Sequence, residues 1–167
     1  MNEKKMIAID DTRFIFETNF AGDKSKDRWG DDRRKANIII PDPRQAQEMI
    51  DAGFKVRQTK PREDDDPDEF IPTYFVQALL KYSDRYGHPL KYPPKVYLVN
   101  MDGEPVPLDE ESVSCLDRIS VANVNVILNS WQTEDGSYSL YIRTMYVEQD
   151  FDDDPYAARY AKRRNND

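Results

Sequence analysis

The feature that most constrains the fold is a pair of alternating segments, residues 119–129 and 138–147. In both, apolar residues occupy every second position, and asparagine, serine, tyrosine or arginine stands between them. A period of two places one row of side chains on a core and the other row outside. Asp135 and Gly136 in the connection can supply the positive φ angles of a hairpin turn. The sequence therefore predicts a long β-hairpin, with an inner row of Val124, Val126, Leu128, Leu140 and Ile142.

Shorter apolar segments bounded by glycine, proline and charged residues predict further strands. In the first of them, Phe14, Phe16 and Phe20 are expected on one face. Pro72 near the start of the longest favours an edge or entry position. The expected strands are residues 13–20, 37–40, 54–59, 70–82 and 95–100.

Two short helices are expected between the strands. Asp42 can cap the first, Pro43 fits its first turn, Gln45 completes the spacing of a capping box, and Gly53 can end it in a left-handed conformation. The second opens at residues 108–111, with Asp109 as its cap.

These elements predict a mainly β fold, an OB-fold-like, partly open barrel with two short helices and long loops. The expected organisation is a flexible leader at residues 1–12 with room for a short strand at residues 6–9, one domain at residues 13–149, and a charged, disordered tail at residues 150–167. The 167 residues suffice for a single domain with a real core.

Composition narrows the cellular setting. The only cysteine, Cys115, excludes an internal disulfide and fits a reducing compartment. No apolar run approaches the roughly 20 residues that span a bilayer, and no signal peptide is recognised. We therefore expect a soluble protein of the cytoplasm.

Catalytic signatures are weak in this sequence. The one histidine, His88, lies in a turn-like loop without a nucleophile pattern, and Cys115 reads as a small core residue. The acidic runs at residues 63–69 and 150–154 lack the spacing of a known ion-binding loop and read as solvated loops. We expect no catalysis, no metal and no cofactor; a metal-dependent nuclease using the aspartate clusters is a distant option.

Basic and aromatic residues point instead to single-stranded nucleic acid, which needs cations along the phosphates and exposed rings for base stacking. The net charge of −8 argues against a uniformly basic binder, but the charges come in blocks. We expect Trp29, Trp131 and Tyr141 to stack bases. The candidate DNA-binding residues are Lys24, Lys26, Arg28, Trp29, Arg33, Arg34, Lys35, Lys55, Arg57, Lys60, Trp131, Tyr141 and Arg143.

The acidic segments at residues 63–69 and 150–154 would then compete for the DNA groove or dock on basic partner proteins. An alternative assigns them the main role, as the surface of a protein-interaction module or an inhibitor that imitates nucleic acid. Homo-oligomerisation through an exposed strand such as residues 70–82 is a further possibility.

With these residues considered, the sequence resembles phage-type single-stranded DNA-binding proteins of the OB-fold class, over most of the chain. The resemblance implies an OB barrel, sequence-tolerant binding of single-stranded DNA, service to DNA replication, recombination or repair in the host cytoplasm, and no cofactor. It lies in the style and order of residues 14–20 (FIFETNF), 71–76 (IPTYFV), 94–99 (PKVYLV), 139–147 (SLYIRTMYV) and 154–160 (DPYAARY).

Overall fold

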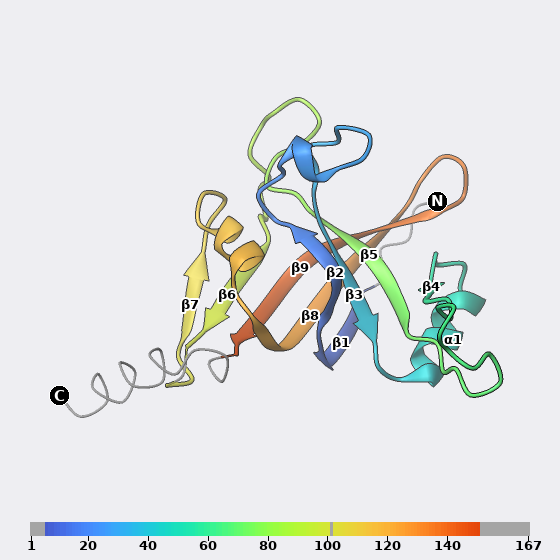
Figure 1. The fold of residues 1–167 in the computed structure, drawn as a ribbon. Helices are drawn as coiled ribbons and strands as arrows, with labels where there is room; N and C mark the ends of the chain where they lie inside the picture. The colour runs from blue at the N-terminus through green and yellow to red at the C-terminus, as the bar shows by residue number, and fades with distance from the viewer. Residues whose placement is uncertain (1–5, 101, 151–167) are drawn as a thin grey trace.

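The structure is a computed structural model that describes residues 6–100 and 102–150. The predicted hairpin contains its two longest strands. Strand β8 (Val121–Gln132) pairs antiparallel with β9 (Tyr138–Gln149), as Figure 1 shows in orange and red. All five side chains of the predicted inner row are buried. In the turn, Gly136 has a φ of +88°, while Asp135 keeps a negative φ. The alternation therefore predicted the core face of the hairpin correctly.

The described residues form one sheet of nine strands in the order β1-β8-β9-β5-β3-β2, with β4 beside β5, β6 beside β9, and β7 beside β6. Because β1 and β2 are consecutive along the chain, the sheet curls on itself. The Ile39 N–H donates to the Arg13 carbonyl at 3.0 Å where the two edges meet. The expected mainly β, partly open barrel is confirmed. Its remaining strands are β1 (Met6–Thr12), β2 (Phe14–Asn19), β3 (Arg34–Ile40), β4 (Arg57–Gln58), β5 (Tyr74–Leu80), β6 (Lys95–Val99) and β7 (Pro105–Leu108).

The predicted flexible leader at residues 1–12 needs correction over its second half. Residues 6–12 are β1, antiparallel to β8, and Ile9 is completely buried opposite Val126. The short strand expected at residues 6–9 is longer and firmly held, because its pairing partner β8 lies more than a hundred residues away and local sequence does not reveal it. Residues 1–5 and most of the predicted tail, 151–167, lie outside the described residues.

Strand β2 departs from the predicted alternation at Phe16. This residue has a φ of +64° at an irregularity in the pairing of β2 with β3. Its ring therefore faces outward against Phe75, at a centroid distance of 5.3 Å, while Phe14 packs edge-on against buried Phe20. The expectation of all three rings on one face is wrong because a bulge turns one of them over.

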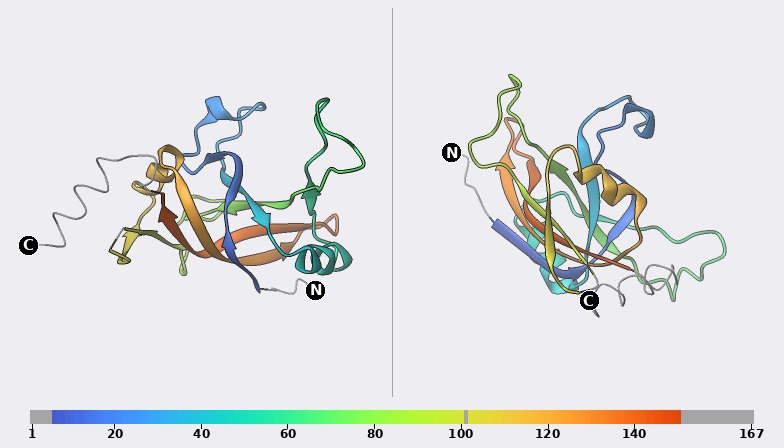
Figure 2. Two further views of the ribbon diagram at one scale, coloured as in Figure 1. Left: turned by 60° about the horizontal axis from the view of Figure 1, so that its bottom comes forward. Right: turned by 90° about the vertical axis from the view of Figure 1, so that its left-hand side faces the viewer.

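Helix α1 (Pro43–Asp51) has the predicted ends. The Asp42 carboxylate accepts from the Arg44 N–H at 2.9 Å, and Gly53 has a φ of +95°. The Gln45 amide donates to the Ala8 carbonyl of β1, so the predicted capping box gives way to a tertiary contact. Two 3₁₀ helices complete the described helical elements, η1 (Lys24–Lys26) and η2 (Val113–Arg118). In both views of Figure 2, α1 and the loop that carries η1 lie on opposite sides of the barrel.

Other strand boundaries differ from the sequence expectations in instructive ways. The strand predicted at residues 54–59 shrinks to the two residues of β4, and that at residues 70–82 shortens to β5. Pro72 lies just before β5, at the entry to the strand. It does not mark an edge, because β5 lies inside the sheet between β3 and β9. The predicted second helix begins only at Val113, after a turn in which the Asp109 carboxylate accepts from the Ser112 N–H at 2.8 Å.

Candidate nucleic-acid interface

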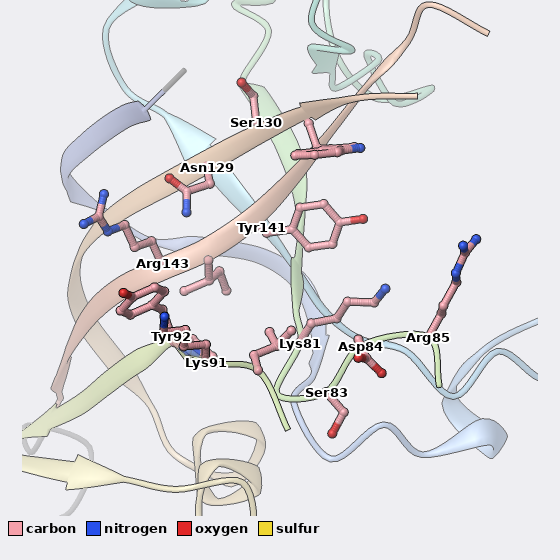
Figure 3. Close-up of a pocket in the computed structure, with 14 residues that line it drawn as sticks. Lys81, Ser83, Asp84, Arg85, Lys91, Tyr92, Asn129, Ser130, Tyr141 and Arg143 are labelled. Atoms are coloured by element: carbon pink, nitrogen blue, oxygen red, sulfur yellow. The ribbon is translucent and has the colours of Figure 1, made fainter. Parts of the chain in front are cut away.

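A groove opens on the outer face of β9 where its neighbouring strand changes. Strand β5 pairs with β9 at Leu79 and Tyr141, and β6 pairs with it from Lys95 and Thr144 onward, both in parallel. Between these points residues 81–94 leave the sheet. They enclose, with β8 and β9, a groove of about 700 Å³ (Figure 3). We call this the β9 groove.

A β-bulge determines which β9 side chains face the groove. Ile127 of β8 pairs with Thr144, but the next residue, Leu128, pairs with Ile142, so Arg143 is the extra residue. Ile142 stays buried, while Arg143 on the bulge is exposed. A bulge re-aims a side chain without breaking the sheet. It leaves Tyr141 and Arg143 on the same outer side, as predicted from their place in the outward row.

Four cations line the β9 groove: Lys81, Arg85, Lys91 and Arg143. None of the four forms an ion pair with an acid of the described residues. The acid that lines the groove with them, Asp84, accepts from the N–H groups of Tyr86 and His88 at 2.9 Å and stands 3.7 Å from the imidazole of His88. The groove therefore keeps a local excess of positive charge although the whole chain is acidic.

Aromatic rings accompany these cations. Tyr92 is 83% exposed and Trp131 is 44% exposed, while Tyr141 is half-buried. The Lys81 ammonium lies 5.8 Å from the centre of the Tyr141 ring, and Figure 3 shows the two side chains running alongside each other. Lys91 lies 5.6 Å from the Tyr92 ring. Cation and ring thus present one combined surface, which suits a phosphate beside a stacked base.

Sequence reasoning placed Trp131, Tyr141 and Arg143 at this site but missed the residues of the 81–94 segment. A signal was present: a cation precedes a tyrosine three times, at Lys81-Tyr82, Arg85-Tyr86 and Lys91-Tyr92. Interleaved cations and rings are the pattern that single-strand binding calls for.

The basic loop, residues 20–35, has a different electrostatic character from the one expected, because its cations meet acids. Lys35 is held by Asp27 and lies 3.8 Å from Asp31, and Arg33 pairs with Asp31 at 2.5 Å. The Lys35 hydrogen bond, followed by that of the Trp29 N–H, lowers the pKa of Asp27 to about 2. The pKa of Asp31 is lowered as well, first by hydrogen bonds from Arg33.

The base of the basic loop is also fixed by an acid. Asp117 of η2 accepts from the Thr18 hydroxyl at 2.7 Å and from the Phe20 and Ala21 N–H groups at 2.8 and 3.0 Å. Its carboxylate also lies 3.8 Å from Lys26. This contact ties the loop to the barrel.

The other predicted residues of the basic loop have separate surroundings. Arg34 donates to the Phe20 carbonyl at 2.8 Å and lies 4.0 Å from Glu110. Lys24 and Arg28 are exposed, and the Arg28 guanidinium lies 5.3 Å from the ring of Trp29, which is 84% exposed. The residues that line the β9 groove include none of the basic loop. Trp29 therefore remains a predicted stacking residue apart from that groove.

The second predicted basic patch borders a smaller cavity. Lys55 and Arg57 line a groove of about 200 Å³ together with Arg33, Tyr138 and Ser139. We call this the second groove. Lys60 is exposed but does not line it. The structure thus brings Arg33 together with Lys55 and Arg57, three residues from two separate segments of sequence.

The two residues considered as catalytic candidates, His88 and Cys115, lie in surroundings without catalytic features among the described residues. His88 is exposed beside Asp84, and burial raises the pKa of the Cys115 thiol. Within residues 6–100 and 102–150, no group of three or more His, Cys, Asp or Glu side chains is arranged to hold a metal ion. Across the same residues, no helix has the length and apolar character needed to cross a membrane.

The sequence matches a known protein family. A family model described as "Putative phage ssDNA-binding domain" matches residues 1–166, nearly the whole chain. No curated protein and no solved structure gives a significant match.

Proposed function

This chain belongs to that phage ssDNA-binding domain family, and from this membership we propose that it binds single-stranded DNA in the β9 groove. Binding is sequence-tolerant, since the cations of the groove neutralise phosphates and its rings stack bases. The observation that carries the proposal is the meeting of four cations outside any ion pair and three aromatic rings in one groove, within the described residues of an acidic chain. One of the four, Arg143, also donates to the sulfur of Met6.

The chemistry of the groove favours single strands over duplex. A ring stacks on a base only if that base has left its neighbours, and each such contact is worth about 1–3 kcal/mol. Tyr92, Trp131 and Tyr141 are the rings we assign to stacking. The phosphate backbone of DNA is the same for every sequence. We assign its neutralisation to Lys81, Arg85, Lys91 and Arg143.

The cellular role we propose is service to DNA replication, recombination or repair, in the cytoplasm of the infected host. The protein acts by binding, without catalysis and without a cofactor. The acidic run at residues 63–69 is exposed at every position, which suits contact with basic surfaces of replication or recombination proteins.

Tryptophan fluorescence tests the groove directly, because Trp131 lines it. In a Trp29→Phe variant, the remaining indole reports on Trp131 alone. We expect oligo-dT to quench it, and a duplex of equal length to do so much less. The logarithm of affinity should fall with the logarithm of salt concentration with a slope near −2.8, four phosphates at about 0.7 each.

Trp131→Ala, followed by anisotropy of a labelled oligo-dT, should weaken binding by about 1–3 kcal/mol. The matched change Trp29→Ala distinguishes the two rings, since it alters an indole outside the groove. No quench and no anisotropy change at low salt would overturn the proposal. A loss in Trp29→Ala with wild-type affinity in Trp131→Ala would move stacking away from the β9 groove.

The acidic run at residues 63–69 also supports a second candidate, an interaction module that imitates nucleic acid. Such a protein would bind basic proteins tightly and leave oligo-dT free in the same titration. Loss of the oligonucleotide in the presence of Mg²⁺ would instead point to a nuclease.

A further inference from the structure

We propose that the β9 groove and the second groove form one continuous path for a single DNA strand, with the second groove as a subsite that only longer strands reach. The inference rests on the proposed function and deepens it. It assigns two ordered subsites to the DNA, and it predicts that affinity depends on strand length in a way that separate residues control.

Continuity follows from the register of β5 and β9. On β9, Ser139 lines the second groove and Tyr141 lines the β9 groove. Leu79 of β5 lines the second groove, and Lys81, directly after the end of β5, lines the β9 groove. Residues two apart on a strand are successive on one face, about 7 Å from each other. Since Leu79 pairs with Tyr141, the two grooves adjoin along both strands at once.

The positive charge of the β9 groove continues into the second groove. Lys55 and Arg57 are exposed, and neither forms an ion pair with an acid that the structure describes. Arg33, the third cation of the second groove, is paired with Asp31. Two cations outside any ion pair of the described residues therefore extend the row of four in the β9 groove, with Lys55 near enough to Asp135 to add to the hydrogen bonds that lower the pKa of that carboxyl.

The second groove also contains a ring. Tyr138 packs on Phe54 with ring centroids 4.7 Å apart, and it remains partly exposed. A ring held from behind by another ring is a fixed platform for a base. The second groove thus repeats, on a smaller scale, the pairing of cations and rings that characterises the β9 groove.

A single strand is the occupant that fits both grooves. Its phosphates carry the charge that the cations complement, and its length lets it cross the Leu79–Tyr141 boundary. The site sizes of single-strand-binding OB folds run from about 4 to 16 nucleotides. A strand at the short end of that range would fill the β9 groove alone, and a longer one would enter the second groove.

The test is a series of labelled oligo-dT strands of about 4, 8, 12 and 16 nucleotides, bound to the full chain. A Lys55→Ala/Arg57→Ala variant should bind the shortest strand like the wild type and lose affinity for the longer ones. The salt slope for long strands should become less steep by about 1.4, two contacts at about 0.7 each, and that for the shortest strand should not change.

The control is Arg44→Ala/Arg118→Ala, which removes two exposed cations that line neither groove. It matches the change in net charge and should leave both slopes and all affinities near the wild type. Thermal unfolding of the two double variants checks that both are folded to the same degree.

Wild-type behaviour of Lys55→Ala/Arg57→Ala with every strand overturns the two-subsite path and leaves the β9 groove intact. Equal losses for short and long strands also overturn it, since the residues would then belong to one undivided site. Failure of the wild type to bind any strand is the separate failure of the proposed function.

Discussion

Tyr82 lies next to Lys81 of the groove but points the other way, toward the core side of the barrel. Among the described residues its hydroxyl is the one buried side-chain polar atom without a hydrogen-bond partner. Burial raises the pKa of Tyr82 to about 12. The Arg34 guanidinium lies 5.6 Å from the centre of its ring. The face of the Tyr82 ring therefore contacts the Arg34 guanidinium, whereas its hydroxyl is removed from water without gaining a hydrogen bond within the described residues.

We therefore expect Tyr82→Phe to leave the stability unchanged or to raise it. An unsatisfied buried polar group costs about 1–3 kcal/mol, and the substitution removes it while keeping the ring. Chemical unfolding at neutral pH measures the change, with Tyr97→Phe on the outer face as the control. A loss of more than about 1 kcal/mol would show that the hydroxyl has a partner, such as an ordered water.

At the scale of elements, the basic loop is held by an acid–base clip rather than left open for DNA. Asp27 accepts hydrogen bonds from Lys35 and from the Trp29 N–H, and these lower its pKa from 3.8 to about 2. A carboxyl whose pKa falls on folding stabilises the folded loop above its unfolded pKa, and that contribution is lost as pH falls through the folded value.

The clip should therefore hold at pH 4 and above and open as the pH falls from about 4 to 2. In a Trp131→Phe variant, fluorescence anisotropy of Trp29 would report loop mobility across this range. Asp27→Asn should give the low-pH mobility already at pH 7. If that variant keeps the wild-type anisotropy at pH 7, another contact, such as the Asp117 anchor, holds the loop.

The elements also show where sequence reasoning succeeds. The period of two over residues 119–129 and 138–147 is local, and it predicted both the buried row and the outward Tyr141 and Arg143. Strand β1 was expected only as a short strand at residues 6–9 of a flexible leader, because its partner β8 lies far along the chain. The β9 groove was missed in part because it exists only where β9 exchanges β5 for β6, and that exchange leaves no local pattern.

The basic loop shows a second limit. Counting cations in residues 20–35 predicted a positive surface, yet Asp27, Asp31 and Asp117 are placed to neutralise several of them. Two of these acids are only a few residues from their partners, so the sequence contained the information. Which charges pair depends on the turn geometry of the loop, which composition does not specify.

At the scale of the whole molecule, an acidic chain has to attract an acidic polymer. The net charge of −8 repels DNA at long range, while the cations of the groove attract it at contact. The acidic run at residues 63–69 is a large exposed source of the repulsion. Salt screens exposed charges beyond a Debye length of about 8 Å at physiological ionic strength. Added salt should therefore weaken the long-range repulsion more than the attraction at contact, and this difference distinguishes the two effects.

Changing Asp64, Asp65 and Asp66 together to asparagine takes the net charge from −8 to −5 by removing three negative charges. At low salt, where the Debye length is about 30 Å, we expect faster association with oligo-dT and a tighter complex. Near 0.15 M salt the advantage should shrink toward nothing, since the screened run acts only at a distance. Stopped-flow fluorescence at both salt concentrations measures the association rate. An advantage that persists at high salt would mean that the run contacts the strand or covers the groove directly.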